Sequence, residues 1–195
     1  MAKACFTGHR AKSLVGYNKA NYTPFVNELS EWLHHYTLTH DIDTFISGGA
    51  QGFDQLAFWA VNKLQRNHPE LSIKNIVYVP FHGQESKWKE TGCFSQHEYS
   101  LMLRCANEVH YCSDKTCKEP FHTLVKLLDD RNKAMVNDSH RVIALYSLLE
   151  NRNGMSSGGT ANCIRYAATK NVPVDRCVYH LTGSIMHITS LPVTG

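Results

Sequence analysis

The segment 47–54 has the composition of a loop that lets an anion approach the backbone. It reads Ser-Gly-Gly-Ala-Gln-Gly-Phe-Asp, and its candidate phosphate-binding residues are Gly48, Gly49, Ala50 and Gly52. Small residues expose backbone N–H groups, and the start of a helix adds the positive end of its dipole. Asp54 is expected in the first turn of that helix, where its carboxylate either caps the helix or bonds a ribose hydroxyl. The spacing matches neither a P-loop nor the Gly-x-Gly-x-x-Gly fingerprint.

A second segment of this kind reads Ser-Ser-Gly-Gly-Thr over residues 156–160, and its candidate residues are Ser157, Gly158, Gly159 and Thr160. The hydroxyl of Thr160 is suited to capping a helix or contacting a phosphate. One such loop often makes only a turn, whereas two on one sheet indicate a ligand with phosphate groups.

Further polar residues follow predicted strands. Thr7, Gly8, His9 and Arg10 follow the first strand, and Arg10 offers donors that suit phosphate or carboxylate. Their alternative role is a tight turn with a solvated arginine. Gln84 and Trp88 follow a strand that ends at Pro80, and the indole either stacks on a base or packs in the core. Arg131 and Asn132 are candidate ligand contacts, with a surface salt bridge as the alternative for Arg131.

The elements that must position these residues alternate between strand and helix. Apolar runs predict strands over residues 4–7, 44–46, 76–79, 108–111, 142–146 and 177–179. Helical spacing predicts helices between them, one of which is expected to start at Thr23 and Pro24. This alternation predicts an α/β fold: a Rossmann-like, doubly wound, mostly parallel sheet with helices on both faces. We expect one domain over residues 1–180, a C-terminal tail over residues 181–195, and ligands at the carboxyl ends of the strands.

The composition narrows the class of protein. The chain has 195 residues, a formal net charge of +3 and seven cysteines without a disulfide framework. With no signal peptide and no apolar run long enough for a membrane span, we expect a cytoplasmic protein with no membrane partner. The sequence contains no cluster of Lys and Arg residues, so a nucleic-acid partner is not expected. The group His110, Cys112, Cys117 and His122 lacks a standard zinc spacing, so neither a metal nor another cofactor is expected.

Five motifs in series resemble the SLOG superfamily of Rossmann-like proteins, nearest to its YpsA-like branch. They cover about residues 4–175 and read Phe6-Thr7-Gly8-His9-Arg10, Ser47-Gly48-Gly49-Ala50-x-Gly52-x-Asp54, Pro80-Phe81-x-Gly83-Gln84-x-x-x-Trp88, Arg131-Asn132-x-x-Met135-Val136-x-Asp138 and Ser157-Gly158-Gly159-Thr160-Ala161-Asn162-x-Ile164-Arg165-Tyr166-Ala167. The resemblance implies binding of nucleotides or nucleotide-derived ligands. Relatives include the LOG phosphoribohydrolases, DNA-uptake proteins of the DprA type and sensors of NAD-derived signals, and YpsA-like members occur in bacteria and their phages.

One departure from this resemblance bears on the function. LOG hydrolases carry Pro-Gly-Gly-x-Gly-Thr-x-x-Glu with a catalytic glutamate, whereas Cys163 stands three residues after Thr160 here. The sequence therefore favours a protein that binds a nucleotide or an ADP-ribose-like ligand, as a sensor or a sequestering protein. The alternative is a nucleoside 5′-phosphate N-glycosidase with Asp54, or less plausibly Asp138, as its carboxylate. Single-stranded DNA binding of the DprA type is a weaker alternative, and the resemblance to LOG proteins is compatible with a homodimer.

Overall fold

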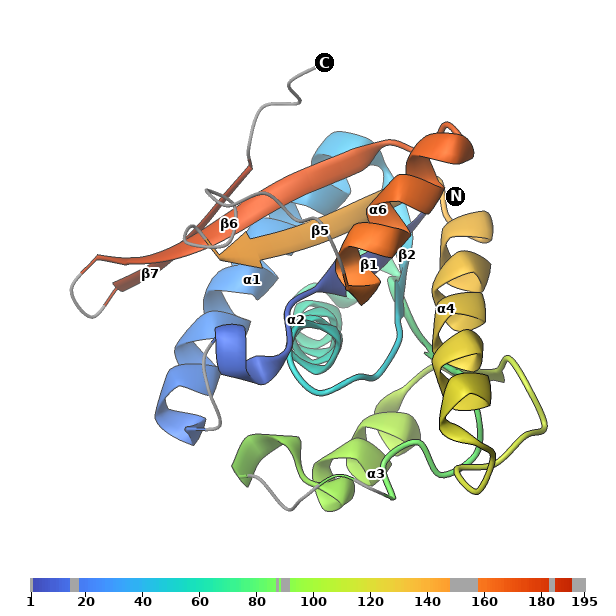
Figure 1. Cartoon of the computed structure of the whole chain (residues 1–195). Coiled ribbons are helices and arrows are strands. Elements are labelled where there is room, and N and C mark those ends of the chain that lie inside the picture. The colour runs from blue at the N-terminus through green and yellow to red at the C-terminus, as the bar shows by residue number, and fades with distance from the viewer. Residues whose placement is uncertain are drawn as a thin grey trace.

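The computed structural model describes residues 2–14, 18–86, 88, 92–147, 158–182 and 185–190. These residues form a seven-stranded sheet in the order β4-β3-β2-β1-β5-β6-β7 (Figure 1). The strands are β1 (Ala2–Gly8), β2 (Ile42–Ser47), β3 (Lys74–Val79), β4 (Glu108–Tyr111), β5 (Arg141–Ser147), β6 (Val174–Thr182) and β7 (Ile185–Ser190). Strands β1 to β6 run parallel, and β7 pairs antiparallel with β6. The predicted Rossmann-like, mostly parallel sheet is confirmed.

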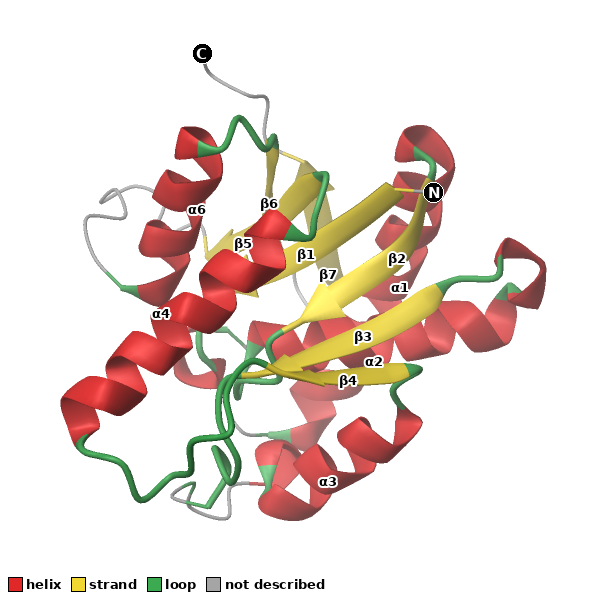
Figure 2. Cartoon of the chain, turned by 90° about the vertical axis from the view of Figure 1, so that its right-hand side faces the viewer, coloured by secondary structure: helices red, strands yellow, loops and turns green. Residues whose placement is uncertain are grey.

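Helices cover both faces of this sheet (Figure 2). They are α1 (Lys19–His40), α2 (Phe53–Asn67), α3 (Gln96–Cys105), α4 (Phe121–Asn137) and α6 (Gly159–Thr169). Short 3-10 turns occupy Ala11–Ser13, Pro69–Leu71 and Gly92–Phe94. Helices α1, α2 and α3 contribute to the clusters on one face, and α4 and α6 contribute to the cluster on the other. No helix among the described residues is long and apolar enough to cross a membrane.

The strand order reverses between β1 and β5. The chain adds β2, β3 and β4 on one side of β1 and then returns to place β5 and β6 on the other side. At such a point the loops after the two central strands diverge and leave a crevice at the carboxyl edge of the sheet. The loops after β1 and β5 are therefore the first place to look for a ligand.

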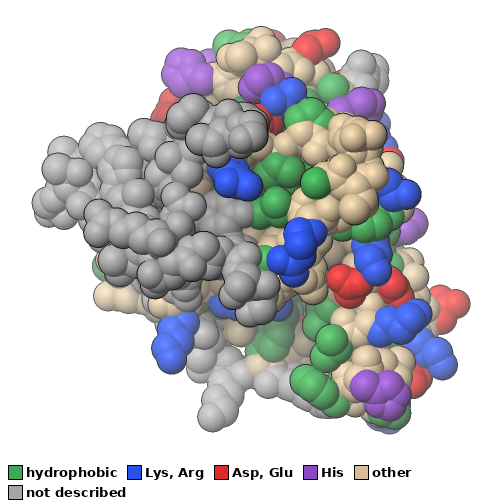
Figure 3. All heavy atoms as spheres, turned by 45° about the horizontal axis from the view of Figure 1, so that its top comes forward, with side chains coloured by type: hydrophobic (Ala, Val, Ile, Leu, Met, Phe, Trp, Pro, Cys, Tyr) green, Lys and Arg blue, Asp and Glu red, His purple; other side chains and the backbone are tan. Residues whose placement is uncertain are grey.

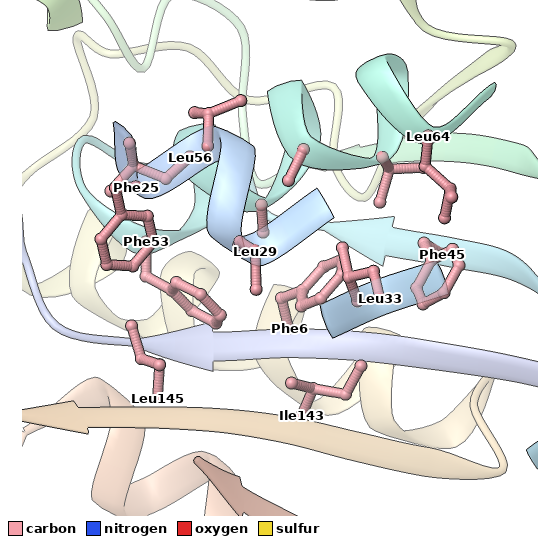
Figure 4. Close-up of a cluster of buried hydrophobic side chains, with 14 of the residues drawn as sticks. Phe6, Phe25, Leu29, Leu33, Phe45, Phe53, Leu56, Leu64, Ile143 and Leu145 are labelled. Carbon is pink, nitrogen blue, oxygen red and sulfur yellow. The ribbon is translucent and has the colours of Figure 1, made fainter. Parts of the chain in front are cut away.

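Buried aromatic side chains fix the start of α2 against β1 (Figure 4). The Phe6 ring stacks on Phe45 at 5.6 Å between centroids and meets Phe53 edge-on at 5.7 Å. Because side chains alternate along a strand, Phe6 faces α1 and α2 while Thr7 faces α4 and α6. Phe53 is the first residue of α2, so the same packing sets the position of the neighbouring Asp54.

Two boundaries differ from the sequence prediction. Helix α1 begins at Lys19, because the side chain of Asn18 accepts a hydrogen bond from the Ala20 N–H at 3.0 Å and caps the helix one turn before Thr23. Pro24 therefore lies inside the helix. Residues 181–195 were expected to be a tail, but β6 extends to Thr182 and residues 185–190 form β7. The hairpin partner supplied by β6 explains the added strand.

Candidate functional site

The loops that follow β1 and β2 are locked together. The Phe53 N–H donates a hydrogen bond to the His9 carbonyl at 3.0 Å. Gly52 has φ +112°, and a Cβ at this position would lie 2.5 Å from the His9 carbonyl oxygen and 2.6 Å from the Ala11 nitrogen. Only glycine suits both the conformation and the close approach. The segment with His9 and the start of α2 are thus joined at the carboxyl edge of the sheet.

Hydrogen bonds within the chain already occupy some of the backbone N–H groups of the predicted anion site at the start of α2. The Ala50 N–H donates to Asp54 Oδ2 at 3.3 Å, and the Phe53 N–H is bonded to His9. Asp54 therefore holds the turn that precedes the helix and places a carboxylate at this end of α2. These contacts leave fewer backbone donors for a phosphate at residues 48–52 than the sequence prediction assumed.

Arg131 reaches this turn from α4 and is almost completely buried. Its side chain is 4% exposed, and its Nη1 lies 3.4 Å from Asp54 Oδ2, whose side chain is 12% exposed. The guanidinium lies directly on Gly48, where an added Cβ would be 1.3 Å from Nη1. Arg131 Nε is buried and has no hydrogen-bond partner among the described residues. Since unsatisfied buried donors are rare and costly, this nitrogen indicates an acceptor that is supplied by a ligand or by water.

In the part of the chain that the structure describes, nothing covers the N-terminus of α6, unlike that of α2. Gly158 caps the helix with φ +100°, and no atom of the described residues lies within 4 Å of the place where its Cβ would be. Gly158 and Gly159 are exposed, and the side-chain nitrogen of Asn132 lies 3.8 Å from the corresponding position at Gly159. The Thr160 hydroxyl donates to the Gly8 carbonyl at 2.9 Å, which ties α6 to the end of β1. The first N–H groups of a helix have no acceptor within it, so this end can bind an anion.

Gln84 and Trp88 pack against α3, where they support the β2–α2 turn. Gln84 is buried, and its Nε2 donates to the Tyr99 hydroxyl at 2.6 Å. The half-buried Trp88 ring meets Tyr99 edge-on at 5.2 Å. At Gly49, with φ +66°, a Cβ would lie 3.0 Å from Tyr99 and Met102 and 3.3 Å from Gln84 Nε2. Sequence reasoning missed Tyr99 and Met102, since nothing local shows that their helix packs on residues fifty positions earlier.

The remaining sequence-predicted residues lie at different depths. Thr7 is buried beside Cys163, which occupies the position of the LOG glutamate. Burial raises the pKa of the Cys163 thiol to about 11, although the hydrogen bond with Thr7 and the charge of Arg131 act to lower it. Arg10 is exposed at the rim. Ser157 lies outside the described residues.

Asp138 lies away from this crevice, at the amino edge of the sheet. It accepts hydrogen bonds from Lys3 Nζ at 2.8 Å and from the Tyr78 hydroxyl at 2.7 Å, and Lys3 stands near the start of β1. Burial acts to raise the pKa of Asp138, but these hydrogen bonds outweigh it and lower the pKa below its ordinary value. Asp138 therefore anchors β1 and β3 to the end of α4.

No metal-binding cluster is found in the part of the chain that the structure describes: no three His, Cys, Asp or Glu side chains there are grouped to hold an ion. His110, from the histidine and cysteine group noted in the sequence, lies against the Tyr78 ring at 4.6 Å.

The strand order and the residues at the carboxyl edge of the sheet define a Rossmann-like α/β protein with its candidate site at the switch point of the sheet. The model of the YspA SLOG family, YpsA, matches residues 4–180, so the chain belongs to this family and the resemblance is confirmed. It is also similar to the uncharacterized SPbeta prophage-derived protein YoqJ of Bacillus subtilis (strain 168). The two are 34% identical over 128 residues, which cover 63% of this chain and 68% of the relative.

Proposed function

We propose that this chain binds a nucleotide or a nucleotide-derived, ADP-ribose-like ligand at the carboxyl edge of the sheet, as a sensor or a sequestering protein. The observation that carries the proposal is the open N-terminus of α6 beside Asn132, next to a buried arginine with an unsatisfied Nε. Both features provide hydrogen-bond donors at one edge of one sheet. A ligand that brings anionic oxygens and hydroxyls there satisfies both.

The two parts of the site suit different parts of such a ligand. The backbone donors of α6 and the Asn132 amide suit a phosphate, since a helix N-terminus favours an anion by about 0.3–1 kcal/mol and by up to about 2 kcal/mol when partly buried. Arg131 and Asp54 carry opposite charges and together offer donors and an acceptor. This pair suits the hydroxyls of a ribose, because a second anion there would face the Asp54 carboxylate.

Binding without hydrolysis is favoured by the groups around Asp54. This carboxylate already contacts Arg131 and the Ala50 N–H, and through these contacts it holds the turn that precedes α2. Cys163, at the position of the LOG glutamate, is buried, and burial raises the pKa of its thiol. An N-glycosidase therefore needs Asp54 to leave its present contacts.

The described part of the face in Figure 3 gives little support to DNA binding of the DprA type. On the face in Figure 3, the described Lys and Arg side chains lie among Asp and Glu side chains and do not form one continuous basic patch. Strong binding of nucleic acid requires a cluster of positive charge.

All seven cysteines are free thiols, which supports a reducing, cytoplasmic compartment. The homodimer implied by the resemblance to LOG proteins would have twice the mass of one chain in solution.

Two experiments test the proposal. Mass spectrometry of small molecules released on denaturation should detect an intact nucleotide or ADP-ribose derivative. Calorimetric titration with ADP-ribose should then show binding that weakens at least roughly tenfold in Asn132→Asp, because the new carboxylate faces the phosphate. Asn137→Asp is the matched control: the same change on the same helix, where the side-chain oxygen accepts from Tyr166 at 3.0 Å. Release of free base from AMP, abolished in Asp54→Asn, would instead establish the N-glycosidase.

A further inference from the structure

Two exposed aromatic rings are stacked at the carboxyl ends of β3 and β4. The rings of His82 and Tyr111 lie 4.3 Å apart between centroids at an interplanar angle of 16°. Tyr111 is the last residue of β4 and is 43% exposed, and His82 is also exposed. A stacked pair with open ring surface is a place where a third flat ring can add to the stack.

The backbone holds this pair rigidly. Tyr111 pairs with Val79 in the parallel ladder of β3 and β4. The His82 N–H donates to the Lys115 carbonyl at 2.9 Å, and the His82 carbonyl accepts from the Cys117 N–H at 2.9 Å. These bonds attach the loop after β4 to the segment after β3, as the course of the loop in Figure 2 illustrates. The rings are therefore positioned before any ligand arrives, which lowers the entropic cost of stacking.

The aromatic pair is continuous with the site described above. Gln84 follows His82 by two residues and reaches Tyr99, which lies against Gly49. Gln84 and Tyr99 thus link the segment that carries His82 to the turn that Arg131 also contacts.

The distance across the sheet limits the ligand. Thr160 ties α6 to the end of β1, and three strand spacings separate β1 from β4, about 14 Å at about 4.8 Å each. Three covalent bonds span about 3.8 Å, so the roughly nine bonds from the phosphorus of a mononucleotide to the far edge of its base span about 11 Å at most. A second phosphate linked to the first adds two bonds, about 2.5 Å, and so covers the difference.

We propose that His82 and Tyr111 form the platform on which the base of an extended nucleotide, such as the adenine of ADP-ribose, stacks. The inference rests on the proposed function, because it assigns the base of the ligand whose phosphates and ribose bind at α6 and Arg131. Stacking of one base on an aromatic side chain contributes roughly 5-fold to 150-fold in affinity.

The test compares ADP-ribose with ribose 5-phosphate, which lacks the adenosine and one phosphate, by calorimetric titration. ADP-ribose should bind the unaltered protein at least roughly tenfold more tightly. In Tyr111→Ala this advantage should fall by at least roughly fivefold while the affinity for ribose 5-phosphate stays the same, and Tyr111→Phe should retain the advantage. Phe121→Ala is the matched control, because Phe121 is an exposed aromatic on α4, 81% exposed and outside the platform.

The outcomes separate the two proposals. If the unaltered protein binds neither compound, the proposed function fails. If it binds both equally, or if a folded Tyr111→Ala keeps the full advantage of ADP-ribose, the platform is overturned while the proposed function stands. Since Tyr111 is exposed, Tyr111→Ala should unfold at the same temperature as the unaltered protein; if it does not, His82→Ala serves as the second variant, with the same expected loss.

Discussion

The substitution Gly48→Ala tests the position of Arg131 directly. The new Cβ would lie 1.3 Å from Nη1, 2.2 Å from Cζ of Arg131 and 2.7 Å from Asp54 Oδ2. Because real Cβ contacts are not shorter than 3.0 Å, the guanidinium must move by at least 3.0 − 1.3 = 1.7 Å. Overpacking of this kind costs about 1–3 kcal/mol, and the lower chain entropy of alanine returns about 0.4–1 kcal/mol. The free energy of unfolding should therefore fall by about 1–2 kcal/mol, which lowers the Tm of a chain of this length by roughly 2–8 °C.

The assay is thermal unfolding followed by titration with ADP-ribose. We expect the lower Tm together with an affinity at least roughly tenfold weaker, because Arg131 leaves the position where its Nε meets the ligand. Gly159→Ala is the control for the fold, since its Cβ would meet Asn132 only at 3.8 Å and should change stability by no more than about 0.5 kcal/mol. A Gly48→Ala protein with unchanged Tm and unchanged affinity would refute the packing of Arg131 on Gly48.

Two further predictions concern the elements that position the site. Asp175 accepts from Arg141 Nε at 2.7 Å and Nη2 at 2.8 Å; burial acts to raise the pKa of Asp175, but the hydrogen bonds from Arg141 and Tyr36 outweigh it and lower the pKa. A lowered carboxyl pKa adds stability above the unfolded value near 3.9 that is lost as the pH falls through the folded value. Asp175→Asn should therefore lower the Tm at pH 7, and the difference should shrink below about pH 4; a constant difference down to pH 2 would contradict this. Thr160→Val removes the hydroxyl that bonds the Gly8 carbonyl and should cost about 1 kcal/mol in urea unfolding, whereas Thr160→Ser should restore most of it; equal losses in both variants would refute the role of the hydroxyl.

The elements of the fold were predictable because each carries its own periodic signal. The expected strand over residues 108–111 is β4 as observed. The start of α1 was not predicted, because Thr23 and Pro24 gave a local capping signal that Asn18 supersedes one turn earlier. Pro24 lies beyond the first turn, where it removes one helical hydrogen bond and its ring crowds the carbonyl four residues earlier, so the helix includes it at a cost in stability.

The interior of the site was less predictable, since it depends on contacts between distant residues. The sequence indicated an anion site at both glycine pairs, but only the structure reveals that the His9 carbonyl and Asp54 already occupy donors at α2. It indicated that Trp88 either stacks on a base or packs in the core, and the ring packs on Tyr99. The stack of His82 on Tyr111 has no local signal, because it joins two strand ends 29 residues apart.

The central claim is that the N-terminus of α6 holds the phosphate of the ligand, and backbone amide NMR tests it most directly. In a titration of isotopically labelled protein with ADP-ribose, the amide signals of Gly159, Thr160 and Ala161 should shift most and saturate with one binding constant. The amides of Phe53 and Ala50, which are bonded within the chain, should shift less. Saturation that moves the α2 amides and leaves those of α6 in place would contradict the account, as would a spectrum that does not change.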